Sequence, residues 1–128
     1  MNRHYTYRIL ECLYEVHNQL GPGLLESIYE EAVASELAAN GFRVERQKPV
    51  PVIYKGKRLM NELRLDLIVD NKVILELKSV TEYKKIFEKQ LFTYLALTNC
   101  EIGYVVNFNE ADLRNGIHTV YNSRYSKD

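Results

Sequence analysis

Three charged residues interrupt the most apolar stretch of the chain, and their types and spacing could hold a metal ion beside an ammonium group. Residues 64–79 contain two hydrophobic runs separated by a polar triplet, which predicts two strands joined by a tight turn. Asp66 interrupts the first run, and Glu76 and Lys78 interrupt the second. Because side chains alternate between the two faces of a strand, Glu76 and Lys78 are expected to project together.

Whether Asp66 joins Glu76 on that face depends on the register of the predicted hairpin. A two-residue loop would pair Asp66 with Leu75 or Leu77, whereas a three-residue loop at 70–72 would pair it with Glu76. Asp and Asn tolerate the left-handed backbone that a three-residue loop needs, which makes that register plausible. Two carboxylates about 5 Å apart repel each other unless a cation lies between them. Ligation by oxygen alone, with open positions, suits Mg²⁺ or Mn²⁺.

A solvated strand face is the competing interpretation of these charges. Charged residues make up 27% of the chain, so acid-x-Lys triplets arise easily, and two more occur at Asp70–Lys72 and Glu82–Lys84. Only Glu76–Lys78 lies inside an apolar run with a lone acid on the preceding strand. In that context, the residues alone support a metal site and a solvated strand face equally well.

Length and composition predict one globular domain covering residues 1–128. No apolar run reaches the roughly 20 residues of a membrane span, and the N-terminal residues lack the apolar segment of a secretory signal. Cys12 and Cys100 lie in apolar periodic segments without zinc-site spacing. We therefore expect buried thiols in a reducing compartment, by default the cytoplasm.

The charge balance gives no overall signature of nucleic-acid binding. The chain has 17 basic and 17 acidic residues, whereas binding to nucleic acid usually rests on a basic surface. Clusters like those in this chain normally serve solubility, although each could contact phosphate. The local basic clusters are Arg43/Arg46/Lys48, Lys55/Lys57/Arg58 and Lys84/Lys85/Lys89.

Hydrophobic periodicity predicts the order α-α-β-β-β-α-β, with a possible last strand. Helices are expected over 5–20, about 24–40 and about 82–98, and strands from 44, in the two halves of the central hairpin, over 102–108 and over 117–121. Pro49 and Pro51 restrict the first strand to a sheet edge or a strand start. The hairpin implies antiparallel pairing, and the strand-helix-strand unit over 73–107 implies a parallel crossover. The expected α/β fold is a mixed sheet flanked by helices.

This order, with an Asp on one strand and Glu-x-Lys on the next, resembles the PD-(D/E)XK nuclease superfamily. Asp66 matches the motif's aspartate and Glu76-Leu77-Lys78 its (D/E)XK element, while Leu65 stands where the motif has proline. The resemblance covers about residues 7–121. It implies a restriction-endonuclease-like αβββαβ core with a mixed β-sheet flanked by helices and an extra N-terminal helix.

Two further motifs narrow the resemblance. Gly23, Glu26 and Tyr29 fit the G-x-x-E-x-x-Y signature of a family of small bacterial proteins in this superfamily. Gln90 and Tyr94 resemble a Q-x-x-x-Y element of recombination-type exonucleases, which would position the phosphate or brace the site. They are four residues apart and share a helix face. Taken alone, Glu26 could merely complement the positive end of its helix, and Tyr94 could be a core residue with Gln90 as its polar neighbour.

The resemblance implies a Mg²⁺-dependent nuclease, with Mn²⁺ as a substitute, that hydrolyses phosphodiester bonds in DNA rather than RNA. Asp66, Glu76 and the backbone carbonyl of Leu77 would bind the metal. Glu26 would approach as a further ligand, directly or through water. Lys78 would orient or help deprotonate the attacking water and offset negative charge in the transition state. The metal would supply Lewis acidity and lower the pKa of the water.

A non-catalytic module on the same fold is the second hypothesis, because fold alone does not establish function. Such a module would bind nucleic acid or a protein partner, and the neutral charge and small size support it. A small domain has little surface for gripping a duplex. A homodimer or a larger complex, which the superfamily resemblance also implies, would supply more. Retention of the motif residues argues against a decayed site.

Overall fold

The computed structural model, which describes residues 1–127, has its helices and strands in the predicted order. The helices are α1 (Arg3–Leu20), α2 (Glu26–Ala39) and α3 (Ile86–Thr98), and the strands are β1 (Val44–Tyr54), β2 (Lys57–Val69), β3 (Val73–Lys78), β4 (Ile102–Asn107) and β5 (Ile117–Tyr121). A short 3-10 helix, η1 (Leu113–Asn115), precedes β5. The possible last strand is therefore present.

The strands form one mixed sheet in the order β1-β2-β3-β4-β5. β3 and β4 run parallel, as the crossover through α3 requires, and the other neighbours are antiparallel. β1 lies at the edge of the sheet, the position to which Pro49 and Pro51 restrict it, because proline has no backbone N–H to donate to a ladder. The predicted mixed sheet and the predicted edge strand are both confirmed.

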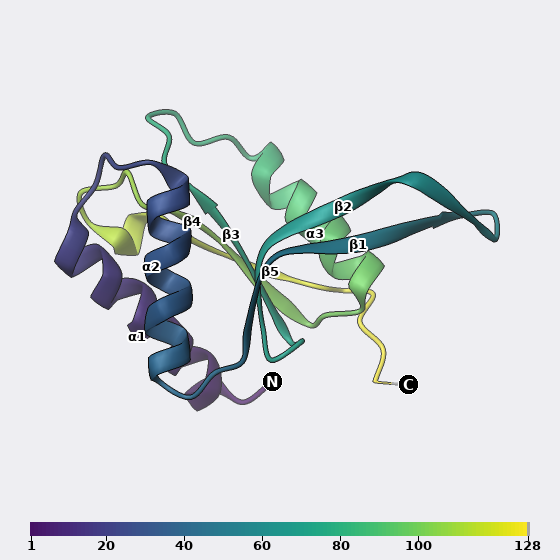
Figure 1. Ribbon diagram of the computed structural model, residues 1–128, viewed down its shortest axis with the longest axis horizontal. Coiled ribbons are helices and arrows are strands. Elements are labelled where there is room, and N and C mark those ends of the chain that lie inside the picture. The colour runs from purple at the N-terminus through teal and green to yellow at the C-terminus, as the bar shows by residue number, and fades with distance from the viewer. Residues whose placement is uncertain (128) are drawn as a thin grey trace.

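The helices cover both faces of the sheet (Figure 1). α1 and α2 pack on one face, where Leu13 and Leu37 join Leu75 in one buried cluster. α3 packs on the other face, where Leu91 joins Ile74 in a second cluster. The restriction-endonuclease-like arrangement with an additional N-terminal helix is confirmed.

The N-terminal boundaries of α1 and α2 differ by two residues from the prediction. α1 begins earlier, at Arg3, since the Asn2 side chain accepts hydrogen bonds from two backbone amides of the first turn. α2 begins at Glu26 instead of near residue 24, since Leu25 keeps an extended backbone at its start.

α3 begins at Ile86, four residues later than the prediction of Glu82. The segment before it is irregular and is held by aromatic contacts instead of helical hydrogen bonds. The Tyr83 ring stacks on His118 at 3.9 Å between centroids and meets the edge of Phe87 at 5.4 Å. A tertiary contact to β5 therefore overrides the helical periodicity of this segment.

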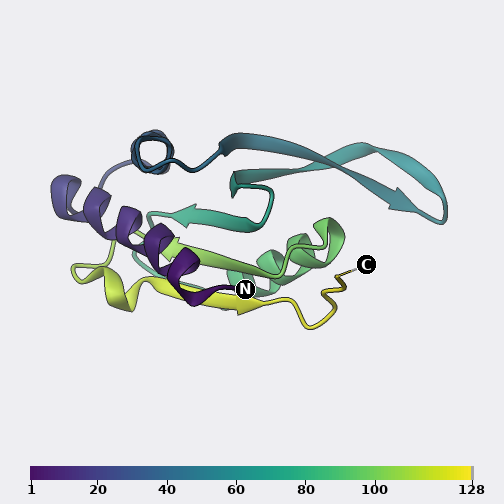
Figure 2. The ribbon, with the colours of Figure 1, turned by 90° about the horizontal axis from the view of Figure 1, so that it is seen from below.

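The outer part of the β1–β2 hairpin leaves the sheet. β3 pairs with β2 only at Leu67, Ile68 and Val69. Residues 48–65, which we call the arm, find strand partners only within the hairpin, with a register shift between Pro51 and Ile53. Figures 1 and 2 show the arm projecting past the rest of the fold as a twisted two-stranded ribbon.

Two predictions concern the chain as a whole. Cys12 and Cys100 are buried and unpaired, as their apolar surroundings predicted, while the reducing compartment stays a prediction. Within the described part of the chain, no helix combines the length and the apolar character needed to cross a membrane.

Candidate active site

Asp66 and Glu76 are cross-strand neighbours at the point where β2 leaves β3. The loop is the three-residue one, with Val69 paired to Val73, and Asp70 and Asn71 have the positive φ angles that this loop needs. The paired ladder ends at Leu67 and Leu75. Beyond it, the Asp66 amide donates to Glu76 Oε2 at 2.9 Å, and the Leu77 amide donates to Asp66 Oδ2 at 2.9 Å. The two carboxylates thus replace the ladder bonds that the diverging strands lose.

The site concentrates negative charge in a poorly solvated place. Glu76 is only 8% exposed, and burial, followed by the charge of Asp66, raises its pKa to about 8. Burial also raises the pKa of Asp66, and the nearby Glu30 and Glu26 carboxylates add to that shift. A carboxylate pair in such a place is stabilised by a positive charge or by a proton.

Lys78 brings positive charge to the same site, two residues after Glu76 on β3. Its charge lowers the pKa of both Asp66 and Glu76, opposing the effect of burial. The ammonium group lies 4.5 Å from the centre of the Phe87 ring, a cation–π contact that holds the side chain on the α3 side. The structure therefore brings together the three charged residues of the central hairpin.

α2 contributes two acids to a pocket of about 330 Å³ beside this pair. Glu26, the first residue of α2, is exposed at the pocket, and Glu30 follows one turn later and is buried. Residues i and i+4 of a helix share a face, so both carboxylates point the same way. Ser27, Gln47, Asp66 and Leu77 complete the lining.

Glu30 is the site residue that the sequence analysis missed. It accepts hydrogen bonds from Arg46 Nε at 3.2 Å and from Gln47 Nε2 at 2.5 Å, and it forms an ion pair with Arg46 at 3.1 Å. Both partners come from β1, so their side chains fix the orientation of Glu30 between helix and sheet. The four-residue spacing from Glu26 is the signal that could have identified it.

Gly23 and Tyr29 lie outside the pocket and shape the loop before α2. The Tyr29 hydroxyl donates to the Gly21 carbonyl at 2.6 Å and accepts from the Leu24 amide at 3.1 Å. Its ring is fully buried and stacks on Phe108 at 4.4 Å. Gly23 has φ of 93°, which favours glycine. These two residues support the position of Glu26 at the helix start.

α3 approaches the acids from the other side through Tyr94. Burial raises the pKa of the Tyr94 hydroxyl, the Glu76 and Asp66 carboxylates raise it further, and a hydrogen bond with Gln90 opposes the shift. Gln90 itself is exposed. The predicted common face of Gln90 and Tyr94 is confirmed. Of the two, Tyr94 is the residue that interacts electrostatically with both Asp66 and Glu76.

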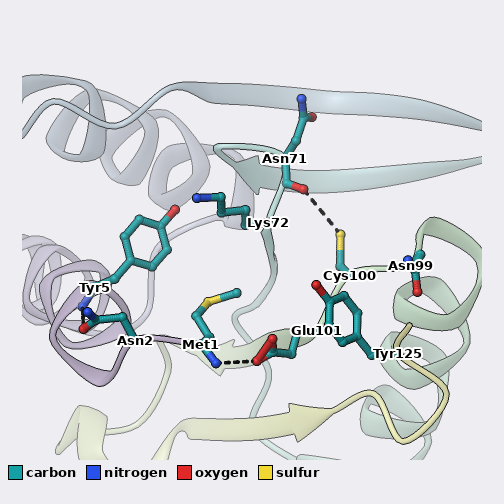
Figure 3. A pocket seen from close by; sticks show the side chains of 9 residues that line it. All are labelled: Met1, Asn2, Tyr5, Asn71, Lys72, Asn99, Cys100, Glu101 and Tyr125. Carbon is teal, nitrogen blue, oxygen red and sulfur yellow. Dashed lines mark hydrogen bonds and ion pairs between the residues drawn. The ribbon is translucent and has the colours of Figure 1, made fainter. Parts of the chain in front are cut away.

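A larger pocket, of about 470 Å³, lies away from these acids, at the other end of β3 (Figure 3). Its lining includes the Asn71–Lys72 turn and one acid, Glu101. The Glu101 carboxylate is paired with the N-terminal amine of Met1 at 2.6 Å. With a single, already paired acid, this pocket lacks the charge arrangement of the Asp66–Glu76 site.

A family model described as the PD-(D/E)XK nuclease superfamily matches residues 3–120. The chain belongs to this superfamily. Membership indicates a nuclease, and PD-(D/E)XK nucleases generally use divalent metal ions. No curated protein and no solved structure matches this chain.

The acids are not gathered around a single point. Within residues 1–127, no three His, Cys, Asp or Glu side chains converge closely enough to hold a metal ion on their own. The Asp66 and Glu76 carboxylates each accept a hydrogen bond from a backbone amide instead. These two hydrogen bonds use Asp66 Oδ2 and Glu76 Oε2, one oxygen of each carboxylate.

Proposed function

We propose that this protein is a metal-dependent nuclease that hydrolyses phosphodiester bonds in DNA, and that it is of the GxxExxY type within the PD-(D/E)XK superfamily. The observation that carries the proposal is the pairing of buried Glu76 with half-buried Asp66 across the hairpin, with the charge of Lys78 acting on both carboxylates. Burying two acids together is unfavourable unless a positive charge compensates them. The hydrogen bonds to the two backbone amides need only neutral acceptors such as side-chain amides, whereas metal-assisted hydrolysis needs the negative charges.

The donor set suits Mg²⁺, with Mn²⁺ as a substitute. Asp66, Glu76 and the Leu77 carbonyl offer hard oxygen ligands, and Glu26 at the pocket can add a carboxylate directly or through water. The Mg²⁺ ion would supply Lewis acidity for a phosphate oxygen. Glu30, held by Arg46 and Gln47, would keep further negative charge near these ligands.

The remaining residues would act on the substrate and on the water. The Lys78 ammonium would orient the attacking water, favour release of that water's proton to solvent through its positive charge, and offset negative charge on the phosphate in the transition state. Its contact with Phe87 restrains the side chain close to the acids. Gln90 is exposed and hydrogen-bonded to Tyr94, and it would bind a phosphate oxygen. Tyr94 would support the site through this hydrogen bond and its position near Glu76.

A nucleic-acid- or protein-binding module is the second candidate, and one observation favours it. The two central carboxylates are satisfied by backbone amides, and among the described residues no three acids converge. A fold that had lost catalysis could retain the pair in this form. Metal binding distinguishes the candidates, because the module needs none.

The test measures Mn²⁺ binding by calorimetry and DNA cleavage for the same set of variants. Asp66→Ala is expected to lose both metal binding and cleavage. Lys78→Ala is expected to keep metal binding and lose cleavage. Glu31→Gln removes an exposed acid from the same helix as Glu30 and should change neither. Full cleavage by Asp66→Ala or Lys78→Ala would refute the assignment, and absence of metal binding by the unmodified protein would favour the module.

We also propose that residues 1–128 form one domain of a bacterial protein that works in the cytoplasm. The two unpaired, buried cysteines support a reducing compartment. A homodimer or a larger complex would bring two sites to the two strands of a duplex. Sedimentation velocity and limited proteolysis would test the oligomeric state and the single domain.

A further inference from the structure

The arm carries most of the unbalanced positive charge of the molecule. Residues 48–65 contain five basic residues and one acid, whereas the rest of the chain contains 12 basic and 16 acidic residues. The tip is the densest part, with Lys55, Lys57 and Arg58 all exposed. The Arg58 guanidinium lies 3.8 Å from Glu62, but its side chain remains 66% exposed. A protein of zero net charge thus has a strongly basic projection.

The arm starts at the candidate active site. Asp66 immediately follows the arm on β2, and the Arg64 guanidinium donates to the Gln47 carbonyl at 3.2 Å, linking the two strands at the base of the arm. The Gln47 side chain in turn holds Glu30 in the site pocket. From Leu65 to Lys57 the strand extends about 26 Å, at about 3.3 Å per residue. The tip can therefore reach phosphates well beyond the bond next to Asp66.

The base of the arm packs on the fold through Leu65 and Val50, which belong to the α3-side cluster, whereas residues 53–62 are exposed. A two-stranded ribbon without a covering layer is marginally stable in water. Apolar side chains are nevertheless exposed at its end: Met60 is fully exposed, and Ile53 and Tyr54 are more than half exposed. Such side chains on a basic ribbon are of the kind that contact base edges and sugars when a ribbon enters a groove.

We propose that the arm binds a DNA duplex, with its ribbon in the major groove and the tip cations on the backbone. The inference rests on the proposed nuclease function and names the form of its substrate. The major groove of B-DNA admits a two-stranded ribbon, whereas the major groove of an RNA helix is too narrow. Lys55, Lys57 and Arg58 neutralise phosphates. Ile53 and Met60 face the groove floor, because Ile53 pairs with Arg58 and Met60 lies two residues further along β2, on the same face.

A second copy of this chain is a less favourable binding partner for the arm than DNA. Two arms packed together would place five basic residues of one copy against five of the other, and like charges across an interface are unfavourable. Pairing at the free edge of β1 is also hindered, because Pro49 and Pro51 donate no backbone hydrogen bond. The charge of the arm is complementary to a polyanion.

The test measures binding by fluorescence anisotropy in EDTA, on a Glu76→Gln background that is not expected to cleave. The probes are a labelled DNA duplex, one of its single strands and an RNA duplex of the same sequence. The arm variant combines Lys55→Ala, Lys57→Ala and Arg58→Ala. The matched control combines Arg3→Ala, Lys72→Ala and Arg124→Ala, which removes equal charge at exposed positions. Lys72 lines the pocket of Figure 3, and Arg3 and Arg124 are the chain neighbours of Asn2 and Tyr125, which also line it.

The arm variant should bind the DNA duplex more weakly, and its slope of log K against log salt should fall by about 2.7, or about 0.9 for each lost phosphate contact. The control variant should keep the slope of the parent protein. The single strand and the RNA duplex should bind more weakly than the DNA duplex and depend less on the arm. Because binding is measured without metal and without cleavage, it tests the role of the arm even if the nuclease proposal fails.

Equal affinity and slope in the arm variant and its parent would overturn the proposal. Equal losses in the arm and control variants would do the same, because they would show only a general charge effect. Equal dependence of all three probes on the arm would refute the groove assignment. Sedimentation velocity tests whether the arm binds a second copy of the chain. Loss of a dimer in the arm variant, with unchanged DNA binding, would show that the arm is a contact between copies.

Discussion

Replacing Glu76 with glutamine should stabilise the metal-free protein at pH 8. Glutamine has almost the same shape as glutamate, and its carbonyl oxygen can still accept the hydrogen bond from the Asp66 amide. The substitution removes one charge from a buried pair without removing the contact. Its effect on stability therefore reports the electrostatic cost that the two acids impose on each other and on the fold.

The magnitude follows from the pKa of Glu76, which burial and the Asp66 carboxylate raise from 4.5 to about 8. Between these two pH values the folded protein keeps a proton that the unfolded chain has released. The stability of the metal-free protein therefore falls as the pH rises through this window. Since one pKa unit corresponds to about 1.4 kcal/mol, the destabilisation at pH 8 is on the order of 4 kcal/mol.

Urea unfolding in EDTA at pH 5 and pH 8 provides the assay. The unmodified protein should lose stability between these pH values, and Glu76→Gln should lose much less. Glu31→Gln, an exposed acid on α2, should behave like the unmodified protein. At pH 8, Mg²⁺ should restore stability to the unmodified protein and have little effect on Glu76→Gln. Identical pH dependence in Glu76→Gln and the unmodified protein would refute the idea of a desolvated acid pair.

Three further substitutions test how the site is supported. Glu30→Gln should weaken Mn²⁺ binding about 10- to 100-fold in calorimetry, the usual loss when a residue that supports the metal ligands is removed. Glu31→Gln should bind Mn²⁺ as the unmodified protein does. Equal Mn²⁺ affinity of Glu30→Gln and the unmodified protein would mean that Glu30 is only structural. Tyr29→Phe keeps the ring stacking and loses both hydrogen bonds to the loop, so it should cost about 1–3 kcal/mol in urea unfolding; no loss would show that the loop is held by other contacts. Gly103→Ala would place a methyl group 2.9 Å from the Ile74 carbonyl and 3.1 Å from Leu91. Thermal unfolding should then show a loss of about 1–3 kcal/mol, and an unchanged midpoint would mean that α3 can move away freely.

The observed register of the central hairpin was one of the registers that the sequence allowed, and local chemistry made it plausible. Only a three-residue loop combines the left-handed tolerance of Asp70 and Asn71 with apolar pairing of Val69 and Val73. The edge position of β1 followed in the same way from its prolines. Features that depend on residues close in sequence, or on the missing backbone N–H of proline, could therefore be predicted from the sequence.

Features that depend on distant partners were not predictable from the sequence. The spacing of Glu30 from Glu26 indicates a shared helix face, but its contacts with Arg46 and Gln47 from β1 are specified by no local pattern on α2. α3 begins late because Tyr83 stacks on His118 from β5. The separation of the arm from the sheet likewise depends on how far β3 extends along β2, which the apolar pattern of β2 does not encode.

Cleavage of labelled DNA, as duplex and as single strand, tests the central claim most directly. The reactions contain Mg²⁺, Mn²⁺ or EDTA, and the unmodified protein is compared with Glu76→Ala. We expect cleavage with either metal, none in EDTA and none by Glu76→Ala. Cleavage that persists in EDTA, or that Glu76→Ala retains in full, would contradict a metal-dependent site at Asp66 and Glu76.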